Sequence, residues 1–277
     1  MPINLFDAAR GNAVSLRQRL DDALVALPQP DRDALTAFRD HVQDQGRVGL
    51  NMRMSTAAEF LADSTHQNIY DFAAQQAKIT GHTEDEVLRR KLGSWYDKRT
   101  AFDNACHDGR HFRYGALNAG GLGASYYGDW CAIVAETKWT ACALVYLEAD
   151  SLKTYMLPGV PALDQAAIAT AAAPSALKGT LAALKHAVAL PGLPTNQWPQ
   201  ALCSSTEYIE AIFTGGLEPR ELESMRVAKK TYEVYADFAY EFLAGGATDD
   251  ERNLMALFGI VVKGLQRTGI PVETIDV

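Results

Sequence analysis

The first 45 residues carry apolar side chains at the three- and four-residue spacing of an amphipathic helix. The two apolar stripes consist of Leu16, Leu20, Leu24 and Leu27, and of Leu35, Phe38 and Val42. Pro28 and Pro30 separate the stripes, and Gly46 ends the second one. The pattern therefore predicts a helical hairpin that packs against the following domain, with binding of a partner as the alternative.

After Gly46 the pattern shifts to short apolar runs, typical of strands, that alternate with helical segments. Strands are predicted over residues 47–53, 112–117, 130–137, 141–147 and 208–214. Helical segments are predicted over residues 64–105, 161–188, 218–229, 232–243 and 249–265. Ser55 is the expected N-cap of a further helix, which follows the first strand.

This mixture of helices and strands predicts an α+β fold in one compact unit. Three segments are expected: a helical N-terminal extension over residues 1–45, a core over residues 46–225, and C-terminal helices over residues 226–277 that pack on the core. The chain has 277 residues, of which 48% are hydrophobic and 22% charged, as in ordinary globular proteins. Its formal net charge of −8 argues against coating nucleic acid, which needs clustered positive charge.

The sequence gives no sign of a membrane segment or of a secretory signal, because it contains no apolar run of sufficient length. The four cysteines are widely spaced at Cys106, Cys131, Cys142 and Cys203. Such spacing indicates buried thiols in a reducing compartment rather than a disulfide framework or a zinc site. The expected location is the cytoplasm, or a target cell into which the protein is delivered.

The segment from Arg113 to Asp129 is dense in glycine and tyrosine. It contains Gly115, Gly120, Gly121, Gly123, Gly128, Tyr114, Tyr126 and Tyr127. Glycines let backbone N–H groups approach a ligand closely, and tyrosine rings stack on planar groups, so the segment is a candidate nucleotide cradle. A wide hairpin with half-buried tyrosines is the equal alternative. The spacing of the glycines between Arg113 and Asp129 matches neither a P-loop nor a dinucleotide-binding glycine motif.

Three further positions are candidates for chemistry. Arg53 ends the first predicted strand, where ligand-binding groups often lie, although a solvent-facing side chain is the simpler interpretation. Glu207 and Glu210 belong to an apolar strand, where a carboxylate needs a partner, and Glu210 is expected to face inward. A structural ion pair is the alternative. A basic cluster at 89–99, which includes Arg99, is expected to be a solvated helix face rather than a phosphate site.

Three blocks of sequence carry a family resemblance. They are GRVGLNMR at 46–53, RYGALN with GASYYGDWC between 113 and 131, and EYIEAIFTGGL at 207–217. Over roughly residues 46–225 the chain resembles a bacterial family known as domain-of-unknown-function family 3626. The same blocks are more distantly similar to ADP-ribosyltransferases, in which a first strand ends in Arg or His, a second supplies Ser or Tyr, and a third begins with the catalytic Glu.

This resemblance implies an ADP-ribosyltransferase-like split β-sheet core with N- and C-terminal helical flanks and NAD as cofactor. It implies Glu210 as the catalytic carboxylate, Arg53 as the residue that holds the nicotinamide ribose or a phosphate, and Tyr114 as the aromatic residue beneath the nicotinamide. The full set implied to bind the cofactor is Arg53, Tyr114, Gly115, Asn118, Ser125, Tyr126, Tyr127 and Glu207. An Arg–Tyr–Glu set mixes the toxin-like and polymerase-like branches, and no metal is implied.

The expected function is NAD-dependent mono-ADP-ribosyl transfer by a toxin or effector to a macromolecular acceptor, protein rather than nucleic acid. An immunity or antitoxin protein is the expected partner. Arginine-modifying ADP-ribosyltransferases carry an acidic residue two positions before the catalytic Glu, where this chain has Tyr208. Arginine is therefore a less favoured acceptor. Glu207 takes the place of that acidic residue if the strand bulges there. The alternatives are NAD hydrolysis and a catalytically silent binding module. A metal-dependent hydrolase is less favoured, because the histidines form no H-E-x-x-H motif.

Overall fold

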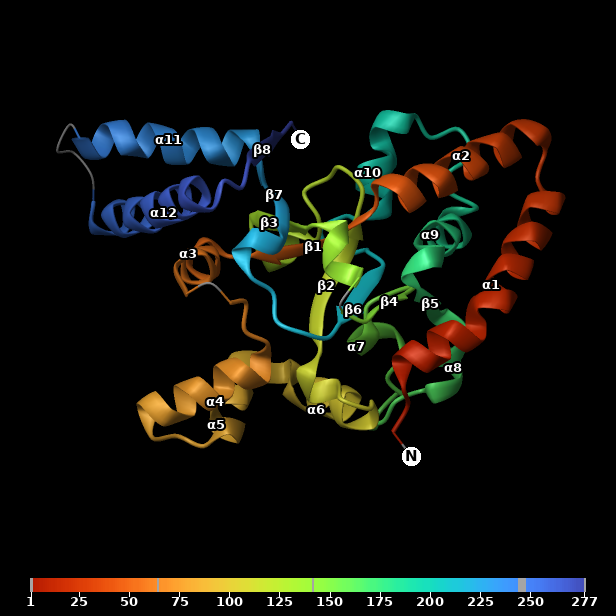
Figure 1. The fold of residues 1–277 in the computed structure, drawn as a ribbon, viewed down its shortest axis with the longest axis horizontal. Helices are drawn as coiled ribbons and strands as arrows, with labels where there is room; N and C mark the ends of the chain where they lie inside the picture. Colours follow the sequence, from red (N-terminus) through yellow and green to blue (C-terminus); the bar gives the residue numbers. More distant parts are fainter. Residues whose placement is uncertain (1, 64, 141, 244–247, 277) are drawn as a thin grey trace.

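The computed structural model describes residues 2–63, 65–140, 142–243 and 248–276, and shows a mixed α/β fold around one open sheet (Figure 1). The described strands are β1 (Arg47–Met52), β2 (Arg113–Asn118), β3 (Trp130–Val134), β4 (Leu144–Leu147), β5 (Ala172–Pro174), β6 (Glu210–Phe213), β7 (Leu222–Ala228) and β8 (Val272–Ile275). Their order across the sheet is β5-β4-β6-β2-β1-β3-β7-β8. Neighbouring strands are antiparallel, apart from the parallel pair β7 and β8.

Helices surround the sheet at both ends and on both faces (Figure 1). They are α1 (Leu5–Ala26), α2 (Gln29–Gln45), α3 (Met54–Asp63), α4 (Ile69–Thr80), α5 (Glu84–Leu92), α6 (Tyr96–Ala105), α7 (Ser151–Thr154), α8 (Gln165–Ala171), α9 (Lys178–His186), α10 (Trp198–Leu202), α11 (Lys229–Leu243) and α12 (Asp249–Thr268). α1 packs on β5 and α8, α2 packs on α9, and α12 packs on α3. The N-terminal hairpin therefore lies at the β5 end, and α11 and α12 lie near the β8 end.

The two faces of the sheet differ in character because side chains alternate along each strand. One face carries the larger apolar core, in which Leu117 and Phe213 meet residues of α2, α3, α9 and α12. On the other face Ile212 and Val145 pack with residues of α1, α6, α7 and α8. Glu210 lies two residues before Ile212 and so projects to this second face. The polar groups considered below belong to that face.

Several predicted elements are confirmed. The stripes of the first 45 residues become α1 and α2, and the strands at 47–53, 112–117 and 208–214 correspond to β1, β2 and β6. The strand predicted at 130–137 ends earlier, at Val134, and the one predicted at 141–147 begins later, as β4, with residue 141 outside the described residues. α3 begins at Met54, so Ser55 is not its N-cap. Residue 64, at the start of a predicted helical segment, also lies outside the described residues.

The helix predicted over 218–229 is wrong. Pro219 opens a short 3-10 turn over Pro219–Glu221, after which the chain forms β7. Met225 and Val227 are buried between the sheet and its covering helices, and Arg226 projects to the opposite face. Glu223 and Arg226 are three residues apart, which is also the spacing of polar residues on one face of a helix, so this spacing favours the wrong prediction. Pairing with β3 and β8 decides the outcome, and this pairing is not visible in local spacing.

The described strands form one hydrogen-bonded sheet, whereas the family resemblance implies a split sheet. Between the two central strands, β1 and β2, pairing is nevertheless limited to one end: Arg47–Gly49 of β1 pairs with Ala116–Asn118 of β2. The other end of β1 pairs with β3, and the other end of β2 pairs with β6. The architecture shown is therefore mixed α/β with one open sheet. Tyr114 lies at the end of β2 that does not pair with β1.

Candidate active site

Glu210 begins β6 in the middle of the sheet, opposite Ala116 of β2 and Leu147 of β4. It is only 3% exposed, and its Oε2 accepts a hydrogen bond of 3.0 Å from the backbone N–H of Ser151. Burial raises the pKa of this carboxyl to about 7, against the opposing effect of the positive charge of Arg99. The negative charge of Asp150 acts in the same direction as burial. At neutral pH the group is therefore close to half ionised.

Tyr114 lies on the same face as Glu210, because it is two residues from Ala116, the residue opposite Glu210. Its hydroxyl donates a hydrogen bond to Asp103, and the guanidinium carbon of Arg99 lies 3.7 Å from its ring centroid. Phe102 and Phe112 pack edge-on against the same ring. Burial raises the pKa of the phenol well above its usual value. Protein side chains thus occupy the surroundings where a nicotinamide ring was expected.

The tyrosine belongs to a buried network that centres on Asp103 of α6. Asp103 also accepts a hydrogen bond of 2.7 Å from the hydroxyl of Tyr70, and Arg99 Nη1 lies 3.6 Å from its Oδ1. Burial raises the pKa of Asp103 and outweighs the opposing effect of Arg99 and of the two phenols. Burial lowers the pKa of the Arg99 guanidinium, but the charges of Tyr114, Asp103 and Glu210 together raise it above its usual value, with Glu210 contributing the least of the three. Arg99 is therefore the guanidinium that the structure brings to Glu210.

A second polar group covers Glu210 from the other side and centres on Asp150. Asp150 Oδ2 accepts hydrogen bonds from the hydroxyls of Tyr208, at 2.8 Å, and Tyr127, at 3.4 Å. The two phenol oxygens are 2.9 Å apart. Burial raises the pKa of Tyr127, and the charges of Asp150 and Glu210 raise it further. Tyr127 thus links the glycine-rich segment to the surroundings of Glu210.

The glycine-rich segment is folded back onto the sheet. The Asn118 amide donates to the carbonyl of Gly121 and its Oδ1 accepts from the Gly121 N–H, both at 2.9 Å. The Asn51 amide donates to the carbonyls of Leu122 and Gly128 at 2.9 and 3.0 Å. Gly123 has φ +72°, and a Cβ at this position would lie 2.2 Å from Asn51 Oδ1. The backbone of the glycine-rich segment therefore closely approaches strand β1, and the Asn118 side chain holds the segment in place through its hydrogen bonds to Gly121.

The remaining aromatic and glycine positions are placed as follows. Ser125, Tyr126 and Tyr127 form a 3-10 turn, in which Tyr126 is 72% exposed and packs edge-on against Tyr127. Tyr126 therefore offers an open ring at the surface beside the Asp150 group. Gly115 lies within β2, where a Cβ would come within 2.8 Å of the Gly49 carbonyl oxygen, so this glycine permits close contact between the two central strands.

Arg53 lies apart from the buried networks. It is the exposed residue directly after β1, and its carbonyl accepts the N–H of Ala57 in the first turn of α3. A Cβ on Gly128 would lie 2.4 Å from the Arg53 backbone nitrogen, so Arg53 adjoins the end of the glycine-rich segment next to Tyr127. The structure therefore brings Tyr114 and Glu210 to one face of the sheet. Arg53 stays at the exposed edge of this site, next to Gly128.

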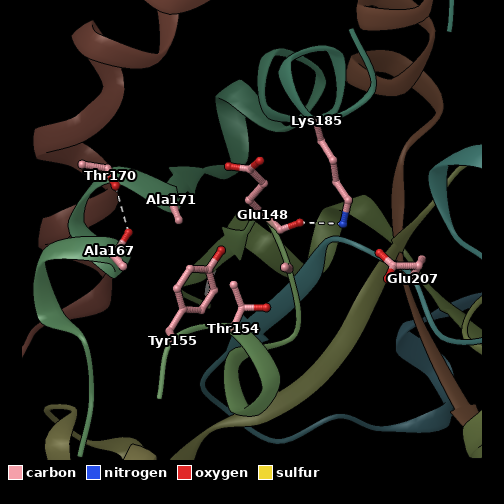
Figure 2. Close-up of a pocket in the computed structure, with 9 residues that line it drawn as sticks. Glu148, Thr154, Tyr155, Ala167, Thr170, Ala171, Lys185 and Glu207 are labelled. Carbon is pink, nitrogen blue, oxygen red and sulfur yellow. Dashed lines mark hydrogen bonds between the residues drawn. The ribbon is translucent and has the colours of Figure 1, made fainter. Parts of the chain in front are cut away.

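Glu207 lies at a surface cavity of about 340 Å³ beside the buried site (Figure 2). Glu148, Thr154, Tyr155 and Lys185 are also among the lining residues. Lys185 reaches across and donates hydrogen bonds to the carbonyls of Glu148, at 2.7 Å, and Tyr208, at 2.8 Å. Burial lowers the pKa of this ammonium group. The backbone contact with Tyr208 places the cavity next to the Asp150 group.

The structure adds Arg99, Asp103, Asp150 and Tyr208 as functional candidates. The prediction that Arg99 lies on a solvated helix face is wrong, because its side chain is only 11% exposed and lies over the ring of Tyr114. Arg99 and Asp103 are one helical turn apart on α6, which is the spacing of a helical ion pair and a usable signal. Asp150 is the N-cap of α7, a role that Asp commonly has for structural reasons. Their approach to Glu210 depends on how α6 and α7 pack on the sheet, so the sequence pattern does not reveal it.

Comparison of the chain with protein-family models, with curated proteins and with solved structures finds no match. In the part of the chain that the structure describes, none of the helices combines the length and the apolar character required to cross a membrane.

Proposed function

We propose that the protein is an NAD-dependent mono-ADP-ribosyltransferase in which Glu210 is the catalytic carboxylate. The observation that carries this proposal is the buried carboxyl of Glu210, which lies on one sheet face with Tyr114 and whose charge acts on the phenol of Tyr127. The second and third sequence blocks of the resemblance therefore contribute to one constellation. The first block contributes Arg53 at its rim, next to Gly128.

The chemistry of NAD cleavage suits such a carboxylate. Breaking the bond between nicotinamide and ribose leaves positive charge on the ribose, and a carboxylate shielded from water stabilises that charge strongly. Glu210 is shielded in this way, and its raised pKa means that a modest rise in pH completes its ionisation.

Substrate reaches Glu210 past the residues that cover it. Tyr127 is 45% exposed and hydrogen-bonded to Tyr208, so separation of these two rings opens the route. Tyr126 offers a surface on which a planar ring stacks, and the guanidinium of Arg53 is free to approach a ribose hydroxyl or a phosphate. In this proposal Tyr114 supports the site from below through Arg99 and Asp103.

The proposal extends to a toxin or effector that modifies a protein in the cytoplasm of a target cell and is held in check by an immunity or antitoxin protein. The support for this extension is the family resemblance of the three blocks. The α+β core with helical flanks agrees with the same resemblance at the level of fold class.

The test is release of nicotinamide from NAD by the purified protein, with and without a lysate that supplies acceptors. Glu210→Gln is expected to lower the rate by at least about 100-fold while the protein stays folded, because the amide cannot stabilise positive charge. Glu59→Gln is the matched control, since Glu59 is an exposed glutamate on α3, and it is expected to keep full activity. Full activity of Glu210→Gln would remove Glu210 from the mechanism.

A catalytically silent binding module is the second candidate, and one observation favours it. Arg99 lies over the ring of Tyr114, and Phe102 and Phe112 pack against its edges, which leaves this tyrosine enclosed by protein. Calorimetric titration with NAD separates the two candidates. The enzyme binds NAD and releases nicotinamide, whereas a silent module binds a ligand without cleavage or ignores NAD altogether.

A further inference from the structure

Asp150 and Glu210 meet at the start of α7. Asp150 caps the helix, with its Oδ1 accepting the N–H groups of Leu152 and Lys153 at 2.9 and 3.1 Å. The next residue, Ser151, donates its N–H to Glu210. Backbone N–H groups at the start of α7 thus donate to both the Asp150 and the Glu210 carboxyl groups. The charge of Asp150 also acts on Glu210.

The two carboxyl groups have different surroundings. Glu210 is 3% exposed and accepts the backbone N–H of Ser151. Asp150 receives two backbone N–H groups and the hydroxyls of Tyr208 and Tyr127, and the ammonium nitrogen of Lys153 lies 3.7 Å from its Oδ2. Asp150 therefore has several hydrogen-bond donors and one ammonium group close to its oxygens. When neighbouring carboxyl groups differ in this way, they commonly divide acid–base roles between them.

Asp150 also has a route to solvent that Glu210 lacks. Its side chain is 13% exposed and accepts the hydroxyl of Tyr208, and the partly exposed phenol of Tyr127 lies within reach to donate to the Tyr208 oxygen, at 2.9 Å, or to Asp150, at 3.4 Å. Phenol hydroxyls donate and accept, so the pair forms a chain along which a proton passes between Asp150 and water. A proton accepted by Asp150 is therefore not trapped in the interior.

We propose that Asp150 is the general base of this site and that the group it activates is an oxygen nucleophile, either water or a hydroxyl group of the acceptor. This inference rests on the proposed cleavage of NAD and adds the class of acceptor to it. Glu210 then keeps the separate task of stabilising positive charge on the ribose.

In this step the bond between the ribose C1′ and the nicotinamide nitrogen breaks, and its electron pair leaves with nicotinamide, which becomes neutral. The nucleophile oxygen forms the new bond to C1′ and gives its proton to the Asp150 carboxylate. That proton then passes through the phenols of Tyr208 and Tyr127 to solvent. A hydroxyl group needs such a base because it attacks poorly with its proton in place, whereas a thiolate arrives already ionised.

The test compares Asp150→Asn with wild type, using NAD as substrate and water, methanol or azide as nucleophile. Removing a general base commonly lowers rates by 10²–10⁴-fold. We expect Asp150→Asn to lower kcat for release of nicotinamide in water or methanol by roughly 100-fold. Azide carries no proton to lose, so it should restore the rate and yield the azide adduct of ADP-ribose. Asp237→Asn, which alters an exposed aspartate on α11, should leave all rates unchanged.

The outcomes separate this inference from the proposed function. A wild-type protein that releases no nicotinamide overturns both. A wild-type protein that cleaves NAD, with Asp150→Asn equally active or slow and not rescued by azide, overturns the role of Asp150 alone. Should Asp150→Asn fail to fold, Tyr127→Phe serves in its place because this ring is 45% exposed. It should slow the water reaction several-fold and leave the azide reaction of the same variant at the wild-type rate, and an equal effect on both overturns the inference.

Discussion

At the scale of single residues, the burial of Glu210 links stability to pH. Its pKa is about 7 in the folded protein and near 4.5 when exposed, so the folded state holds the proton more tightly. The protonated group therefore favours folding below pH 4.5, and this advantage is lost as pH rises to 7. Its size is on the order of 3 kcal/mol, since one pKa unit corresponds to about 1.4 kcal/mol.

Glu210→Gln removes this dependence. Between pH 5 and pH 8 the unfolding free energy of Glu210→Gln should rise relative to that of wild type by roughly 2.5 kcal/mol, because the glutamine does not ionise and part of the wild-type change already lies below pH 5. Urea denaturation at both pH values measures the difference, and titrations shared by the two proteins cancel. A difference that does not change with pH would show that Glu210 is ionised in solvent-like surroundings.

The network around Asp103 is testable in the same way. Tyr70→Phe removes one of the phenols that donate to this buried carboxylate, so it should cost about 1–3 kcal/mol of unfolding free energy. Tyr126→Phe removes the hydroxyl of an exposed ring and should change stability by less than about 0.5 kcal/mol. Equal effects in urea denaturation would contradict the network.

At the scale of elements, the glycine-rich segment depends on its contact with β1. Gly123→Ala places a methyl group against the Asn51 side chain at a positive φ, so it should cost at least about 2 kcal/mol. Gly11→Ala within α1 meets no neighbouring atom and should stabilise by about 0.5–1 kcal/mol. Similar melting temperatures for the two variants would mean that the segment does not lie on the sheet.

Sequence patterns predict the elements wherever local chemistry decides them. The apolar stripes around Leu16 and Phe38 predict α1 and α2, and alternation after Gly46 predicts β1. Three strands escape prediction: β5 lies within the helical segment predicted over 161–188, β7 within the helix predicted over 218–229, and β8 within the C-terminal helices predicted over 226–277. Pairing with distant strands keeps these segments extended. The inward position of Glu210 is predicted by its apolar neighbours, whereas the approach of Arg99 and Asp150 depends on helix packing and is not.

At the scale of the whole molecule, the sheet order brings distant segments of the chain together. β6 lies between β4 and β2, so Glu210 has Tyr114 on one side and the start of α7 on the other. The resemblance supplies β1, β2 and β6 in chain order, but it says nothing of the α6 and α7 residues that complete the buried networks. Under the proposed function, the resemblance selects Glu210 as the carboxylate, and the fold brings Arg99 and Asp150 near it.

The molecule should also unfold as one unit, since α12 packs on α3 beside the first strand. A Cβ at Gly264 would lie 2.7 Å from Leu61 Cβ, so Gly264→Ala should lower the free energy of unfolding of the entire protein by about 1–3 kcal/mol. Gly259→Ala, in the same helix with no neighbour within 4 Å, should raise it by about 0.5–1 kcal/mol. Two separate transitions in calorimetry, with only one moved by Gly264→Ala, would contradict a single unit.

In the proposed reaction ionised Glu210 drives cleavage of NAD, so the rate of nicotinamide release by the wild-type protein should depend on pH. The ionised form is the active one, so the wild-type rate should rise with pH along a single titration with its midpoint near 7. Glu210→Gln should be at least about 100-fold slower throughout and lack this rise. No release from wild type at any pH, or the same profile in both proteins, would contradict the account.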